Sequence, residues 1–274
     1  MKSEELRQTA SRAIEELAAT LEAGQSEALT SYLSAVARFH RYSLHNVFLI
    51  AMQKPTATYV AGFHTWKKLG RFVKKGEKGI YILAPLVSKR SGSESVESED
   101  EAVLLGFRAC AVFDYSQTEG PEMPTIGKVA GEPAFYHTRL VAFVSAQGIS
   151  LVFSDAIAPA HGVSHGGRII LLPGMAAAET FLTLVHEFAH ELLHRERNRG
   201  ELSKRQRETE AEAVAYVVCN AIGLETGTAC QDYIQLYRGD AQLLTDSLEN
   251  VRRAASQILR AICDEEDQGF RTAA

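Results

Sequence analysis

The chain has 274 residues, of which 46% are hydrophobic and 23% are charged, and its net charge is −5 at pH 7. These values are typical of a globular protein with one or two domains, and the acidic balance argues against a general polyanion-binding protein. No apolar run approaches the length of a membrane-spanning helix, and the first residues lack the apolar core of a secretory leader. We therefore expect a cytoplasmic protein without a membrane partner.

The first half of the chain is predicted to combine helices and strands. Apolar residues recur at helical intervals over 4–24 and 26–53, and the second helix is expected to stop at Lys54-Pro55. Three short runs rich in β-branched and aromatic residues are predicted to be strands, at 57–63, 79–85 and 104–116. A short helix and a basic glycine turn are expected between the first two strands.

The second half is predicted to be mostly helical, with a small β-sheet. Helical periodicity covers 133–148, 176–196, 207–224 and 240–266. Two apolar runs, 149–155 and 167–173, are predicted to be strands separated by a turn at 161–167. The stretch 121–132 is rich in proline and glycine and is predicted to link a domain at 1–120 to a domain at 133–274. The predicted fold class is α+β.

The most informative motif is His186-Glu187-x-x-His190, within the helix predicted at 176–196. Residues four apart share one face of a helix, so both imidazoles can reach one metal ion. Glu187 lies one step around the helix, where it can accept a proton from a water molecule on the metal. The helix is rich in apolar residues, and a buried helix does not carry these polar groups without a partner. The motif therefore predicts a zinc hydrolase site.

A third ligand is predicted in the segment Glu208-Thr209-Glu210-Ala211-Glu212, which resembles the Glu-x-x-Ala-Asp/Asn element of gluzincin metallopeptidases. By that resemblance Glu208 binds zinc and Glu212 hydrogen-bonds a zinc histidine from behind. Glu212 as the ligand is the alternative. Glu210 points away from their shared face and is expected to be solvated. His194 is about 12 Å from His186 along the helix, so it is expected to support the site without binding the same ion.

Two histidines and one carboxylate leave a coordination position open for water, as catalytic zinc sites do. The expected reaction is peptide hydrolysis, with zinc acidifying the water and Glu187 moving its proton to the leaving amine. Zn²⁺ suits these ligands, and Mn²⁺ or another divalent ion is an alternative. Tyr216 is a candidate oxyanion donor or an ordinary core residue. The strand 167–173 is a candidate edge for pairing with an extended substrate.

A basic segment in the first half predicts contact with single-stranded nucleic acid. Residues 42–90 contain nine Lys or Arg and one acid, Glu77, and three aromatic residues are interleaved with the cations: Phe63, Trp66 and Phe72. Cations follow phosphates, and aromatic rings stack on unpaired bases. The alternative is that the lysines surround an ordinary surface turn and Trp66 belongs to the core.

This segment resembles the N-terminal domain of ArdC-type antirestriction proteins, through Tyr42-Ser43-x-x-Asn46, Gly62-Phe63-x-x-Trp66 and Lys75-Gly76-Glu77-Lys78-Gly79. The second half resembles the ImmA/IrrE-related zincin metallopeptidase domain found behind it. The resemblance implies single-stranded DNA binding and protection of incoming DNA from restriction. The candidate DNA-binding residues are Tyr42, Asn46, Phe63, Trp66, Lys67, Lys68, Arg71, Lys74, Lys75 and Lys78.

Two other functions remain as alternatives. One is a regulatory protease of the ImmA type that cleaves a repressor, in which the first domain recruits protein. The other is a single-stranded DNA-binding protein with a non-catalytic metal site. Glu187 beside the histidines argues against a purely structural site, and the basic aromatic segment favours DNA. The expected partners are single-stranded DNA and a peptide or protein substrate of unspecified sequence.

Overall fold

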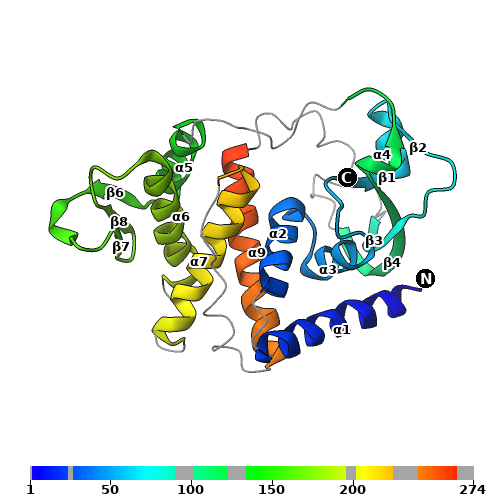
Figure 1. Cartoon of the computed structure of the whole chain (residues 1–274), viewed down its shortest axis with the longest axis horizontal. Coiled ribbons are helices and arrows are strands. Elements are labelled where there is room, and N and C mark those ends of the chain that lie inside the picture. The colour runs from blue at the N-terminus through cyan, green and yellow to red at the C-terminus, as the bar shows by residue number, and fades with distance from the viewer. Residues whose placement is uncertain are drawn as a thin grey trace, which may run out of the picture. The chain divides into compact units, whose positions relative to one another are not determined.

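The computed structural model describes residues 2–23, 27–89, 102–122, 134–195, 202–224 and 240–263. It is an α+β protein with small sheets, as predicted (Figure 1). The chain forms two compact units: Met1–Ala13 with His45–Pro121, and Ile14–Leu44 with Glu122–Ala274. The second unit thus includes an early helical stretch that the sequence prediction counted within a domain at 1–120. Only residues 121 and 122 of the predicted linker lie within the described residues.

The first unit is built on two small antiparallel sheets. Strand order is β1-β4-β3 in one sheet and β2-β5 in the other. The strands are β1 (Val60–Gly62), β2 (Phe72–Val73), β3 (Ile80–Lys89), β4 (Ala102–Asp114) and β5 (Thr118–Glu119). The short helix α4 (Phe63–Lys68) follows β1 directly. The three strands predicted in this half are confirmed.

Apolar spacing in the N-terminal helix α1 (Ser3–Glu22) matches its packing. Leu6 and Ala10, four residues apart, are fully buried in one cluster with Leu49 and Leu83. Asn46 fixes this arrangement, because its amide nitrogen donates to the carbonyl of Leu83 and its amide oxygen accepts from the N–H of Leu83. A side chain that satisfies both backbone groups of one residue holds helix α3 (Leu44–Gln53) at a set register on β3.

The predicted helix over 26–53 is instead two helices, α2 (Glu27–Phe39) and α3. The backbone turns between them, where the N–H of Tyr42 donates to the carbonyl of Phe39. The carbonyls of His40 and Tyr42 accept from the guanidinium of Arg252. The break is therefore supported by a residue more than 200 positions later, which the local apolar spacing cannot reveal.

The second unit combines several helices with a small mixed sheet. Among the described residues, its helices are the second half of α1, α2, α5 (Ala134–Ala146), α6 (Ala177–His194), α7 (Lys204–Ala221) and α9 (Ala241–Cys263). α7 packs against α6, α2 and α9, so it is central to this unit (Figure 1). No helix within the described ranges is long and apolar enough to cross a membrane.

The sheet of the second unit has the order β6-β8-β7, with β6 (Ser150–Phe153) parallel and β7 (Gly162–Ser164) antiparallel to β8 (Arg168–Leu171). The prediction of β8 as an exposed edge is wrong, because strands pair with it on both sides. The edge beside α6 is β7, which lies within the predicted turn at 161–167. A three-residue strand with a glycine has too little β-branched character to be recognised from sequence.

Asp114 ends β4 and organises the turn that follows. Its carboxylate accepts hydrogen bonds from the backbone N–H groups of Thr58, Tyr59 and Ser116, and it caps the 3₁₀ helix Tyr115–Gln117. Burial opposes ionisation, but these hydrogen bonds outweigh it and lower the pKa of Asp114. The carboxylate therefore stabilises the fold in its charged form.

Replacing Asp114 with Ala should lower the free energy of unfolding by about 3 kcal/mol, because several buried N–H groups lose their acceptor. The folded pKa of Asp114 lies below its unfolded value of about 4, so its stabilisation is present above that pH and is lost as pH falls through the folded pKa. Denaturant titrations of wild type and Asp114→Ala between pH 3 and about 7 check both points. Glu119→Ala, at an exposed position, is the control and should unfold like wild type; equal stability of Asp114→Ala would contradict the assignment.

Candidate metal centre

Helix α6 presents its motif residues from a firmly packed core. Five of its apolar side chains are fully buried: Phe181, Leu184, Val185, Phe188 and Ala189. The ring of Phe188 meets that of Phe143 edge to face, with centroids 5.4 Å apart. This packing fixes the rotation of α6 about its axis. The partly exposed histidines His186 and His190 consequently face one side together.

Helix α7 begins with a capping box. The hydroxyl of Ser203 accepts from the N–H of Gln206, whose side chain accepts from the N–H of Ser203. The cap satisfies backbone donors at the helix start and sets where the helix begins. Glu208 then lies in the second turn. Ala211, one turn later and fully buried, has a side chain small enough for close packing with α6.

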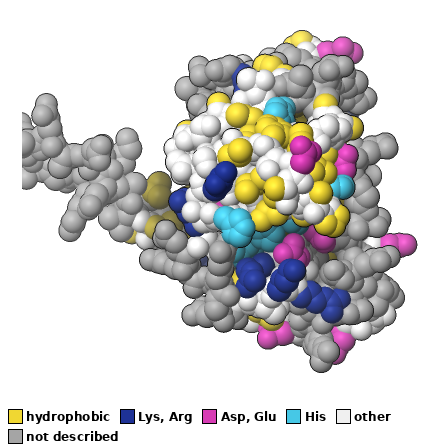
Figure 2. All heavy atoms as spheres, turned by 90° about the vertical axis from the view of Figure 1, so that its left-hand side faces the viewer, with side chains coloured by type: hydrophobic (Ala, Val, Ile, Leu, Met, Phe, Trp, Pro, Cys, Tyr) yellow, Lys and Arg dark blue, Asp and Glu magenta, His cyan; other side chains and the backbone are white. Residues whose placement is uncertain are grey.

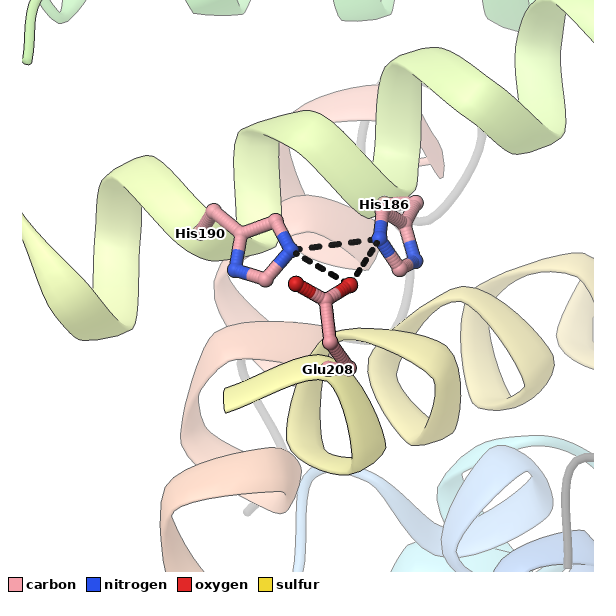
Figure 3. A group of neighbouring side chains, drawn as sticks. All are labelled: His186, His190 and Glu208. Carbon is pink, nitrogen blue, oxygen red and sulfur yellow. Dashed lines mark hydrogen bonds and ion pairs between the residues drawn. The ribbon is translucent and has the colours of Figure 1, made fainter. Parts of the chain in front are cut away.

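His186, His190 and Glu208 converge between these helices (Figure 3). The two Nε2 atoms lie 3.2 Å apart, and Oε2 of Glu208 lies 3.4 Å from Nε2 of His186 and 3.5 Å from Nε2 of His190. Ligands of a tetrahedral zinc ion are about 3.3 Å from one another. These three donor atoms therefore fit one small divalent ion.

The side chains of this cluster shift one another's pKa values. Hydrogen bonds from His186 and His190 lower the pKa of Glu208. Burial acts against the charged form of His186, but the hydrogen bond with Glu208 and the charge of Glu187 outweigh it and raise the pKa of His186. Protons thus compete for the same nitrogen atom that would bind a cation, so metal affinity should fall with decreasing pH.

Glu187 lies beside this cluster and is 7% exposed. Burial raises the pKa of its carboxyl group, and the neighbouring histidines only partly oppose this. β7 packs directly on this side chain: a Cβ at Gly162 would be 2.8 Å from Cγ of Glu187 and 2.6 Å from Thr183. Glycine at 162 therefore lets the strand approach Glu187.

An open cavity of about 340 Å³ lies at this cluster. It is lined by β7, by side chains of α6 including Glu187 and His190, and by Lys204, Arg207 and Glu208 of α7. Figure 2 shows histidine and acidic side chains at this hollowed face, with basic side chains gathered beside them. The sequence interpretation missed Gly162, Lys204 and Arg207, because only the fold brings them to the motif.

The structure separates the other residues predicted around the metal site. Glu212 is exposed, and its negative charge contributes to the raised pKa of His186. The prediction that Glu210 is solvated is wrong: it is buried and 3.0 Å from His194, which in turn contacts His190. The hydroxyl of Tyr216 is hydrogen-bonded to Ser34 on α2, so this residue is a core tyrosine.

Comparison with known proteins agrees with this fold. Residues 4–113 match the family described as the N-terminal domain of anti-restriction factor ArdC. Two crystal structures of the antirestriction ArdC protein from plasmid R388, metal-free and Mn(II)-bound, share the fold with TM-scores of 0.53 and 0.55. Each is 21% identical, and each match covers 93% of this chain and 98% of the other. The match to the ArdC N-terminal domain thus covers residues 4–113, and the whole chain shares its fold with the R388 protein.

A further relative is an uncharacterized protein of Bacillus anthracis, 25% identical, with 83% of this chain and 46% of that protein covered. The chain thus spans about half the length of this relative.

Within the matched residues 4–113, the predicted DNA-binding residues divide by exposure. Phe63 is 51% exposed, and five lysines are exposed around it and in the following turn: Lys67, Lys68, Lys74, Lys75 and Lys78. Three others have structural roles instead. Trp66 is fully buried and donates to the carbonyl of Phe113, Asn46 binds Leu83, and buried Arg71 binds Thr118. These three side chains are therefore not available to stack on bases or contact phosphates.

Tyr42 lies outside this group, in the second unit, where it is partly buried and its ring meets Phe39. Phe72, the third of the aromatic residues interleaved with the cations, is 53% exposed. Of the three aromatic residues interleaved with the cations, Phe63 and Phe72 consequently have rings open to solvent.

Metal binding should distinguish Glu208 from Glu212. Glu208→Gln removes the carboxylate nearest both Nε2 atoms and should weaken Zn²⁺ or Mn²⁺ binding at least 100-fold. Glu212→Gln, four residues later on the same helix, should change it less than about tenfold, as expected for a group outside the ligand set. Chelator competition measures both constants. A stronger loss in Glu212→Gln would reverse the assignment.

Proposed function

We propose that this chain is an antirestriction protein in which the N-terminal domain binds single-stranded DNA and the second unit is a metal-dependent peptidase. The observation that carries the enzymatic part is a buried Glu187 beside three converging ligand atoms in an open cavity. A site that only stabilises the fold has no need of an additional carboxylate or of access for a substrate.

The ligands proposed for the metal are His186, His190 and Glu208. Two imidazoles and a carboxylate suit Zn²⁺, which we favour, and they also accept Mn²⁺. The Mn(II)-bound structure of the R388 protein supports a divalent ion in a chain of this fold. When bound, such an ion supplies Lewis acidity, which acidifies water and polarises a carbonyl group.

Glu187 is the proposed general base. It accepts the proton from the attacking water molecule and returns it to the amine that leaves as the peptide bond breaks. Its raised pKa supports this role, because a stronger base takes a proton more readily near neutral pH. Partial burial also limits the number of competing water molecules around the carboxylate.

The edge of β7 is the proposed place for the substrate backbone. The carbonyl of His161 accepts from the N–H of Leu172, just after β8, and the N–H of His165 donates to the carbonyl of Arg168, the first residue of β8. The backbone groups of odd-numbered residues along β7 therefore face β8. Because parity alternates along a strand, the backbone groups of Gly162 and Ser164 face away from β8. Both residues line the cavity, so an extended peptide pairing there would pass beside Glu187.

Glu187→Gln should retain metal affinity but lose peptide hydrolysis by about 10³-fold or more, because it keeps the shape of the side chain and removes its basicity. Cleavage of an unstructured protein such as casein, followed by mass spectrometry, measures the activity. Glu119→Gln is the matched control at an exposed position and should cleave like wild type. Equal turnover by Glu187→Gln would rule out the general base. Metal binding without cleavage by wild type would favour a non-catalytic site.

The proposed DNA surface consists of the exposed residues Phe63, Phe72, Lys67, Lys68, Lys74, Lys75 and Lys78. The lysines supply charge along the phosphates, and the two phenylalanine rings can stack on unpaired bases. Gly76 supports the turn that carries Lys74, Lys75 and Lys78, because its φ of 89° is rarely adopted by other residues. Such binding requires no particular base sequence.

The double variant Lys74→Glu/Lys75→Glu should bind a single-stranded oligonucleotide at least tenfold more weakly. The slope of log binding constant against log salt concentration should become shallower by about 1.4, as expected for two lost phosphate contacts. Fluorescence anisotropy at several salt concentrations measures this. Lys2→Glu/Arg12→Glu makes the same charge change at two exposed positions, one just before α1 and one on it, and is the control. Unchanged binding by the first variant would exclude this surface.

A further inference from the structure

Next to the proposed metal ligands lie two polar residues that the proposed mechanism does not use, and one of them, His194, also lines the cavity. His194, at the end of α6, is 2% exposed, and Glu210 of α7 is 4% exposed. Burying a carboxylate and an imidazole costs free energy unless each finds a partner. Each of these two buried groups is therefore expected to have a polar partner.

The two residues form a continuous line of contacts that ends at a metal ligand. Oε2 of Glu210 lies 3.0 Å from Nε2 of His194. Nδ1 of His194 lies 3.2 Å from Nδ1 of His190, and Nε2 of His190 is the atom facing His186 and Glu208. Each ring uses one nitrogen atom toward the metal cluster and the other away from it.

Only one distribution of protons along this line of contacts leaves His190 able to bind a cation. Nε2 of His190 must offer a lone pair, so its proton is on Nδ1 and is donated to Nδ1 of His194. His194 then has its proton on Nε2 and donates it to Glu210. A carboxylate without a proton can only accept a hydrogen bond, so Glu210 favours this tautomer of His194.

We propose that Glu210 and His194 are positioning residues that hold His190 in the metal-binding tautomer. The inference rests on the proposed metal site and adds the groups that set the orientation and proton of one ligand. Imidazole ligands usually donate their second N–H to a carboxylate or carbonyl group, and here a second imidazole stands between ligand and carboxylate. The geometry points to Glu210 for this role, in place of the exposed Glu212.

Affinity for Zn²⁺ tests the inference without any activity assay. In Glu210→Gln, the amide can rotate and donate to Nε2 of His194, so the selection between tautomers is lost. We expect zinc affinity to fall by about 10- to 100-fold in chelator competition. The matched control is Glu191→Gln, another buried glutamate, whose carboxylate accepts from the N–H of Gly167. It should bind zinc like wild type, and equal affinities for all three proteins would overturn the proposal.

A spectroscopic measurement on wild type decides the matter even if Glu210→Gln fails to fold. Long-range ¹H–¹⁵N spectra of the zinc-loaded protein should show the proton of His190 on Nδ1 and that of His194 on Nε2. A proton on Nδ1 of His194 would overturn the proposal. If wild type binds no zinc, the proposed metal site itself fails; if zinc binds normally with His194 in the other tautomer, only the positioning role fails.

Discussion

The packing of α6 against α7 is the constraint on which the second unit depends. Two carboxylates on α7 contact histidines at different positions along α6. Glu208 lies near His186 and His190, and Glu210 lies near His194. A shift of α7 by one residue would rotate both carboxylates by about 100° and separate all of these pairs. The apolar core and the polar contacts therefore specify the same register of the two helices.

Residues of the candidate site could be predicted from sequence where local geometry decides. His186, Glu187 and His190 follow from helical spacing alone, and Glu208 from a similar spacing aided by resemblance. The prediction for Glu210 is wrong because its spacing from Glu208 and Glu212 alone does not show which face of α7 is buried. Glu210 is four and seven residues before the buried Val214 and Val217, and that spacing places it on a buried face of α7.

The first unit shows the opposite case, where long-range pairing decides the role of a residue. The sequence predicts that Trp66 stacks on a base and that Arg71 binds a phosphate. In the structure they are hydrogen-bonded to Phe113 and Thr118, which are more than 40 residues away. Whether an aromatic or basic side chain is buried depends on which strand packs over it. The composition of a short stretch of sequence does not show which strand that is. The lysines of the glycine turn are exposed, as expected for a segment without apolar periodicity.

The second unit is built from two separate segments of the chain, Ile14–Leu44 and Glu122–Ala274. α2 belongs to it, and Leu29, Leu33 and Val36 on that helix are buried, while Ser34 reaches the hydroxyl of Tyr216 on α7. A fragment starting after the proline-rich stretch would lack this helix and would expose an apolar face of α7 to water. The first unit is thus interrupted in sequence by residues 14–44 of the second unit, and the second unit cannot be separated by a single cut.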